Sequence, residues 1–163
     1  MKKITLGKPN TLRKCIELKN VDISNIKDVP YNTQINIINQ LYLGSLIEKY
    51  NIIISGLRSK LHSYKSQDEK KERYDVETFI KEEELYEKLV ISKLRCYYCR
   101  NEVKIAYNFK RDNFQWTLDR TDNDLGHSSA NTVICCLKCN LQRRVTDAKK
   151  FAFTKNLRII KKN

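Results

Sequence analysis

Two short stretches decide how the second half of this sequence folds: CYYC at residues 96–99 and CLKC at residues 136–139. Each places two thiols on one side of a tight turn, and the 36 residues 100–135 lie between the turns. Four thiolates from two such turns complete a tetrahedron, which suits zinc and leaves no position open for a substrate. We therefore predict a structural Zn²⁺ ion, with a redox pair or buried free thiols as the alternatives. Its expected ligands are Cys96, Cys99, Cys136 and Cys139.

The two remaining cysteines are expected to be structural. Cys135 adjoins the second turn, but only Cys136 repeats the spacing of the first, so Cys135 is predicted to point into the core. Cys15 stands alone and is expected to be buried and inert. The first residues contain no apolar run typical of a signal peptide, which argues against a disulfide framework.

The distribution of apolar residues also predicts the compartment in which the protein is found. Without a secretory signal, we expect it to be intracellular, in the cytoplasm, nucleus or a viral compartment, and not secreted. The longest apolar-rich stretch, around residues 52–57, is far too short to span a bilayer, so no membrane partner is expected.

Positive charge dominates both ends of the chain. The net charge is +13, with +7 in residues 1–67, −4 in residues 68–88 and +10 in residues 89–163. A compact basic protein attracts polyanions, because each phosphate that it neutralises releases condensed counterions. The charge favours nucleic acid as the partner, whereas solubility alone is the other interpretation.

The first ninety residues are expected to be mainly helical. Apolar residues recur at three- and four-residue steps over 33–65, which predicts one helix or two, with a kink or a break near Gly56. Residues 66–74 are polar and indicate a connector or a solvated helix end. A second helical pattern covers 75–94, and its acidic run Glu82–Glu84 is interpreted as a solvated face rather than a metal site.

From residue 95 onward the pattern favours short strands. Apolar and polar residues alternate over 103–109 and again over 114–118, which predicts a hairpin. A loop is expected over 121–131, a short strand over 132–135 and a helix from about 140 to 151. The fold class is thus α+β, with a mainly helical N-terminal region over 1–94 and a zinc-stapled module over 95–163.

The stretch between the two cysteine turns carries a resemblance. Residues 118–131 read LDRTDNDLGHSSAN, and CLKCN follows at 136–140. This resembles the HNH nuclease motif, whose pattern runs Asp-His, then Gly, then Asn, then Cys-x-x-Cys with His or Asn. It looks most like a branch found in phages and large DNA viruses. The match covers about 95–153 and implies a ββα-metal fold.

The resemblance implies roles for particular residues. Asp119 would be the first ligand of a catalytic Mg²⁺ or Mn²⁺ ion and Asn140 the second, and hard oxygen ligands of this kind suit magnesium. Asn131 would order the loop or the general base. Arg143 and Arg144 could hold flanking phosphates as bidentate donors.

One residue departs from the family pattern. Arg120 stands where the family has its general-base histidine, and a guanidinium cannot take a proton from water. Either His127 acts as the base, or Arg120 stabilises charge on the nucleic acid while a metal-bound hydroxide attacks, or cleavage is lost and binding remains. Asp122 and Asn123 are expected to shape the turn.

These sequence features are compatible with three functions. The leading prediction is a metal-dependent endonuclease that hydrolyses phosphodiester bonds in DNA. The alternative is a catalytically inactive zinc module that binds nucleic acid or takes part in an assembly. A third is a structural protein whose N-terminal helices bind a protein partner or another copy of the chain.

Overall fold

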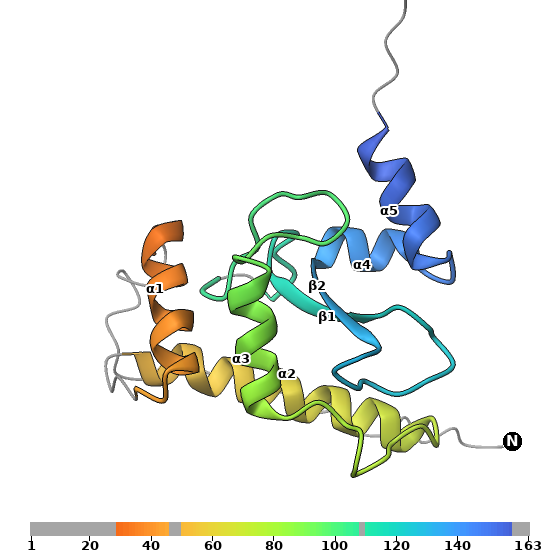
Figure 1. The fold of residues 1–163 in the computed structure, drawn as a ribbon, viewed down its shortest axis with the longest axis horizontal. Coiled ribbons are helices and arrows are strands. Elements are labelled where there is room, and N and C mark those ends of the chain that lie inside the picture. The colour runs from red at the N-terminus through yellow and green to blue at the C-terminus, as the bar shows by residue number, and fades with distance from the viewer. Residues whose placement is uncertain (1–28, 46–49, 108–109, 158–163) are drawn as a thin grey trace, which may run out of the picture.

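Helices and one small sheet make up the protein, so the predicted α+β class is confirmed. The computed structural model describes residues 29–45, 50–107 and 110–157. The elements follow one another along the chain as α1 (Tyr31–Tyr42), α2 (Asn51–Lys70), α3 (Glu82–Ile91), β1 (Trp116–Arg120), β2 (Thr132–Cys136), α4 (Leu137–Arg143) and α5 (Ala148–Asn156) (Figure 1).

The sheet consists of β1 and β2, paired antiparallel. Trp116 lies opposite Cys136 at one end and Arg120 lies opposite Thr132 at the other. The strands predicted over 114–118 and 132–135 are therefore confirmed, with small shifts at their ends. The prediction of a strand over 103–109, paired with 114–118 as a hairpin, is wrong for residues 103–107, and residues 108 and 109 lie outside the described part of the chain.

A side chain from α1 explains why residues 103–107 form no strand. The backbone N–H groups of Ile105 and Ala106 donate to Oε1 of Gln34, at 2.9 and 3.2 Å, instead of to a neighbouring strand. Only Lys104 makes a bridge, to Gln115. The alternation in the sequence still reports burial, since Val103 and Ile105 are buried while Lys104 is exposed.

The N-terminal helical pattern divides at Gly44, and the predicted break at Gly56 is wrong. Gly44 has φ of +74° and its N–H donates to the carbonyl of Leu41, so it ends α1 in the left-handed conformation that glycine adopts without strain. Gly56 lies inside α2, where packing of Ile53, Ile54 and Leu57 outweighs its low helix propensity.

The helices predicted over 75–94 and 140–151 are both shorter than expected. α3 begins only at Glu82, and the segment before it bridges to the loop, with Ile80 N–H donating to the carbonyl of His127. Residues 137–156 form two helices, because Arg144 has φ of 50° and Asp147 then caps α5 by accepting from Lys150 N–H.

The acidic run occupies the first turn of α3, where negative charge favours the helix dipole. Glu83 is exposed as expected. Glu82 and Glu84 have partners within the protein: Glu82 pairs with Arg58 at 2.8 Å, and Glu84 accepts from Lys81 N–H.

Helices and the first cysteine turn cover both edges of the sheet. On the β1 edge, Lys60 Nζ donates to the carbonyl of Trp116 and the Tyr64 hydroxyl accepts from Leu118 N–H. On the β2 edge, Lys88 Nζ donates to the carbonyl of Thr132. A two-stranded sheet is only marginally stable alone, so these contacts hold it in place.

One hydrophobic core runs through the described residues, from Ile37 in α1 to Ala148 in α5. It is continuous across the predicted boundary at residues 94 and 95, since Leu94 and Cys96 are both fully buried in it. The helical region and the cysteine-containing region therefore share their packing.

The Lys60 ammonium occupies an unusual apolar position. It lies 4.8 Å from the ring centres of both Tyr107 and Trp116, which favours the charged form by cation–π attraction. Burial nevertheless lowers the pKa of Lys60 to about 7.

Candidate functional site

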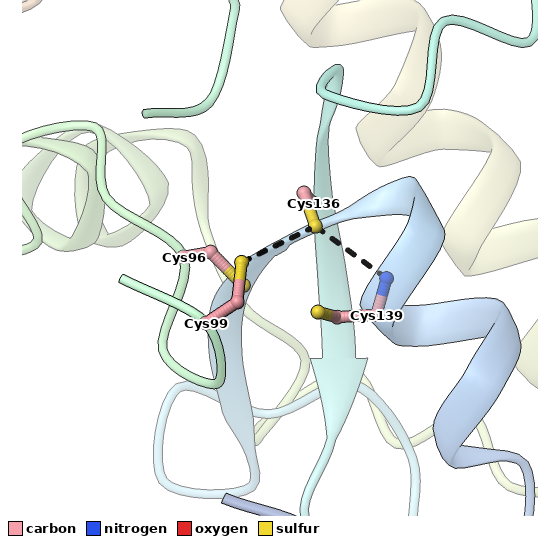
Figure 2. Close-up of side chains that lie close together, drawn as sticks. All are labelled: Cys96, Cys99, Cys136 and Cys139. Carbon is pink, nitrogen blue, oxygen red and sulfur yellow. Dashed lines mark hydrogen bonds between the residues drawn. The ribbon is translucent and has the colours of Figure 1, made fainter. Parts of the chain in front are cut away.

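The four cysteines of the two turns come together where β2 meets α4 (Figure 2). Their sulfur atoms all lie within 4.8 Å of one another, and the sulfurs of Cys99 and Cys136 are 3.9 Å apart. Four thiolates around zinc, at a Zn–S distance of about 2.3 Å, would lie about 3.8 Å apart. The cluster therefore has the donor chemistry and the spacing to hold a metal ion such as zinc.

Local backbone geometry brings the two turns together. Leu94 has φ of 47°, which redirects the chain after α3 into the first turn. Tyr97 N–H donates to the carbonyl of Ile134 at 2.9 Å, tying this turn to β2. Cys136 is the N-cap of α4, and its sulfur accepts from Cys139 N–H at 3.4 Å. The backbone that carries all four sulfurs is therefore held in place by contacts among the first cysteine turn, β2 and α4.

Hydrogen bonds among the thiols perturb their acidity. The contact with Cys136 lowers the pKa of Cys96 to about 5 and raises the pKa of Cys136. Burial raises the pKa of Cys139 to about 12. A bound metal ion would take the place of these protons, so its affinity would fall as the pH falls.

Cys135 lies outside the cluster, as predicted. Its side chain is fully buried, with the sulfur 3.2 Å from Oγ1 of Thr117. Cys15 lies outside the described residues. Within residues 29–45, 50–107 and 110–157, the four-cysteine cluster is the one group of three or more Cys, His, Asp or Glu side chains close enough to share an ion.

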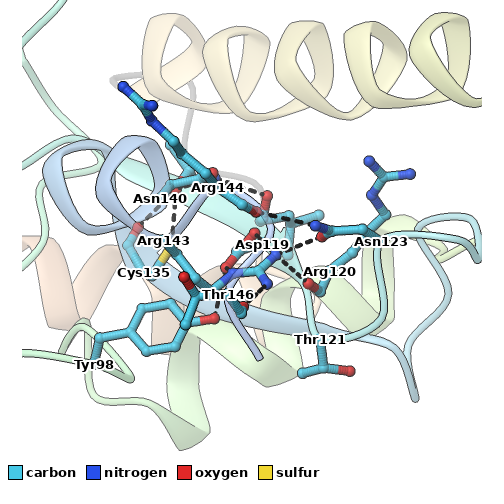
Figure 3. Close-up of polar contacts among 12 residues, drawn as sticks. Tyr98, Asp119, Arg120, Thr121, Asn123, Cys135, Asn140, Arg143, Arg144 and Thr146 are labelled. Atoms are coloured by element: carbon cyan, nitrogen blue, oxygen red, sulfur yellow. Dashed lines mark hydrogen bonds and ion pairs between the residues drawn. The ribbon is translucent and has the colours of Figure 1, made fainter. Parts of the chain in front are cut away.

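Asp119 lies at the end of β1 in a buried polar network facing α4 (Figure 3). Its carboxylate accepts from Nε and Nη2 of Arg143, at 2.5 and 2.9 Å, and from the hydroxyl of Tyr98 at 2.6 Å. Arg143 also donates to Oδ1 of Asn123. We call Tyr98, Asp119, Asn123 and Arg143 the α4 cluster.

Arg143 is an internal cross-link rather than a surface cation. It is 2% exposed, and Nη1 donates to the carbonyl of Thr146 at 2.7 Å. Burial alone would lower the pKa of Arg143, but its contacts with Asp119 outweigh that effect and the pKa is raised. The expectation that Arg143 binds phosphate is therefore corrected, because its donors are used within the protein. The Arg144 side chain is exposed.

The two expected ligands of a catalytic ion lie on the same side of β1 but have other partners. Asn140 Nδ2 donates to Oγ1 of Thr117 at 3.1 Å, while Asp119, two residues further along β1, binds Arg143. Both oxygens of Asp119 are occupied. In this arrangement the Asp119–Asn140 pair does not fit Mg²⁺ or Mn²⁺, because the guanidinium already stands where a cation would bind the carboxylate.

Arg120 and His127 belong to a second buried network, next to α2. Both oxygens of Asp68 are used by His127: Oδ2 accepts from the backbone N–H at 2.6 Å, and Oδ1 lies 2.8 Å from Nδ1. Arg120 Nη1 is 3.8 Å from Asp68 Oδ1 and also donates to the carbonyl of Leu125. We call Asp68, Arg120 and His127 the α2 cluster.

His127 combines burial with a fixed ring. It is 4% exposed and packs on Tyr64, with ring centres 4.7 Å apart. Burial lowers the pKa of His127, despite the opposing effect of Asp68, so the ring is neutral at pH 7. When Nδ1 donates to Asp68, the lone pair is on Nε2. His127 also borders a cleft of about 330 Å³, together with Arg73, Thr78 and Ser128.

Asn131 orders the loop between the two strands. Its Oδ1 accepts from Asp122 N–H and the Thr121 hydroxyl, and its Nδ2 donates to the carbonyls of Asp122 and Gly126. Gly126 is required by close packing, since a Cβ there would lie 2.4 Å from the carbonyl oxygen of Arg73. Asp122 shapes the turn as expected, by accepting from Asp124 N–H.

Two residues of these networks were missed by the sequence analysis. Asp68 lies four residues after Tyr64, so it continues the buried stripe of α2, and a carboxylate in such a stripe signals a buried partner. Tyr98 lies inside the first cysteine turn, where its burial follows from packing against Phe151 of α5. No local pattern identifies Asp119 as its partner.

The sites combine a four-cysteine cluster that could hold a metal ion with two buried ionic networks around one two-stranded sheet. Comparison with known proteins finds no matching family model, no matching curated protein and no matching solved structure. Among the described helices, none is both long enough and apolar enough to cross a membrane.

Proposed function

We propose that this protein is a zinc-stapled, HNH-like endonuclease that hydrolyses phosphodiester bonds in DNA with the help of a divalent ion. The observation that carries the proposal is the order β1, loop, β2, α4. It puts Asp119 at the end of β1 and Asn140 on α4, against the same side of that strand. This is the order in which the HNH motif supplies its metal ligands.

Further support comes from the metal centre and from His127. Zinc at the four cysteines would hold β2, α4 and the first cysteine turn together, as a closed structural ion does. Asp68 orients a neutral His127 whose Nε2 could accept a proton, which would supply the base that Arg120 cannot.

Metal binding at Asp119 would require a rearrangement of the α4 cluster. Asp119 must exchange Arg143 and Tyr98 for a divalent ion before it can act as a ligand, since both of its oxygens are engaged.

A second candidate function is favoured by the same ion pair. If the ion pair between Arg143 and Asp119 persists, no divalent ion binds Asp119. The module then binds nucleic acid through its surface cations without cleaving it. Arg120 in place of the family histidine agrees with this alternative.

Nicking of supercoiled plasmid, with Mg²⁺ or Mn²⁺, separates the two. If the protein is a nuclease, the wild type should nick the plasmid and Asn140→Ala should not. This variant leaves the Asp119–Arg143 pair intact. Gln142→Ala, at an exposed position of the same helix, is the matched control and should nick normally. A wild type inactive with both ions, despite a full metal centre and a normal melting temperature, would favour the binding module.

A further inference from the structure

The turn between α4 and α5 displays an apolar side chain at the edge of the molecule. Val145 is 89% exposed, and Leu141, one helical turn earlier, is 63% exposed. The turn lies far from α1, at the opposite end of the fold (Figure 1). Large exposed aliphatic groups on a compact protein indicate a contact surface when other features agree.

The turn is held rigidly from beneath. Asn123 Nδ2 donates to the carbonyl of Arg144 at 3.0 Å, and Arg143 Nη1 donates to the carbonyl of Thr146 at 2.7 Å. Arg144 has φ of 50° and ψ of −110°, a conformation that a non-glycine residue keeps only when its surroundings impose it. The α4 cluster thus fixes the backbone that presents Arg144 and Val145.

The two helices that flank Val145 carry mostly cationic side chains, while the loop that contacts the turn through Asn123 adds the exposed carboxylates of Asp122 and Asp124. The side chains of Arg144, Lys149 and Lys150 are exposed beside it, as are those of Lys138 and Lys155 on the same two helices. Asp147 is the only carboxylate within residues 137–157, and it caps α5 by accepting from Lys150 N–H. Charge complementarity therefore favours a polyanion that contacts the lysines and Arg144.

We infer that the α4–α5 turn binds double-stranded DNA, with Arg144, Lys149 and Lys150 on phosphates and Val145 against the base pairs in the groove. Proteins that bend a duplex from the minor groove insert apolar side chains between base steps and contact the groove with Arg and Lys. Single strands instead stack on exposed aromatic side chains, of which α5 offers Phe153, 68% exposed. The inference rests on the proposed function only in taking nucleic acid as the ligand.

Fluorescence anisotropy with a labelled 20-base-pair duplex tests the turn, using the full chain with its metal centre loaded. Lys149→Ala with Lys150→Ala should lower the affinity and reduce the slope of log affinity against log salt by about 2, because two phosphate contacts are lost. Lys70→Ala with Lys71→Ala, at two exposed positions at the C-terminal end of α2, should change neither. Val145→Ser should weaken binding, whereas Val76→Ser, at another exposed valine, should not.

Several results would overturn the inference. One is a duplex affinity that does not change in the turn variants, and another is a wild type that does not bind duplex at all. The inference would also fail if the wild type bound phosphatidylserine vesicles instead of DNA. It would fail as well if the wild type preferred a single strand and lost that preference in Phe153→Ala. Plasmid nicking by the same preparations separates the two proposals. Binding through the turn without nicking removes only the nuclease, and nicking with full binding by the turn variants removes only this inference.

Discussion

The α4 cluster and the α2 cluster hold the same loop from two sides, by different means. In the α4 cluster, Arg143 binds Asp119 directly and both belong to the cysteine-containing region. In the α2 cluster, Asp68 comes from a helix 59 residues earlier and binds a neutral histidine, with Arg120 further away at 3.8 Å. Adjacent residues of β1 reach the two clusters because strand side chains alternate in direction.

This difference indicates which network depends on the four-cysteine cluster. Tyr98 of the α4 cluster lies within the first cysteine turn, and Arg143 lies on the helix that Cys136 caps. The α2 cluster is built from α2 and the loop. We therefore expect loss of the metal to disrupt the α4 cluster first.

The largest effect should come from Cys99→Ser, which removes one ligand of the proposed zinc ion. Structural zinc contributes on the order of 10 kcal/mol to folding in small domains. Elemental analysis should find one zinc per wild-type chain and none in the variant. Hydrogen exchange should then show lost protection in α4 and α5 before α2. The matched control is Cys135→Ala, which should keep its zinc, and full zinc in Cys99→Ser would contradict the proposed centre.

A smaller effect is expected from Asp119→Ala, which leaves the Arg143 guanidinium buried without its carboxylate. Such a loss costs about 3–5 kcal/mol. Urea unfolding should show this decrease in the free energy of unfolding, and Asp119→Ala combined with Arg143→Ala should be less destabilised than the sum of the two single variants. Additive effects would mean that the pair is not coupled in solution.

The third effect concerns the contact between the loop and the segment that follows α2. Gly126→Ala would place a Cβ 2.4 Å from the carbonyl oxygen of Arg73, so the backbone must shift. Overpacking of this kind costs about 1–3 kcal/mol. Thermal unfolding should show the loss, while Ala130→Gly, elsewhere in the same loop, should preserve the contact. A variant as stable as the wild type would mean that the loop does not pack this closely.

The smallest effect is a pH dependence from the α2 cluster. Because burial lowers the pKa of His127 in the folded state, the unfolded state binds more protons as the pH falls below the ordinary histidine value of 6.5. The free energy of unfolding should therefore decrease as the pH falls through this range. His127→Gln should flatten that dependence relative to wild type, whereas His62→Gln, at an exposed histidine of α2, should leave it unchanged.

The sequence was most informative where spacing or alternation is local. It identified the two cysteine turns, both strands and Asn131, because each depends on residues close together in the chain. It did not identify Gln34 as the hydrogen-bond acceptor for residues 105 and 106, which turned a predicted strand into an irregular segment. Asp68 and Tyr98 depend likewise on partners 59 and 21 residues away. Such contacts exist only once the chain has folded.

The position of Lys60 makes Trp116 a spectroscopic probe of the junction between α2 and the sheet. Trp116 is the only tryptophan in the chain, it is buried, and the Lys60 ammonium lies over its ring. Its emission should therefore report whether α2 is docked on β1, without any added label. Because the pKa of Lys60 lies at about 7, the charge over the indole should change near neutral pH, and the emission of the folded protein should change with it.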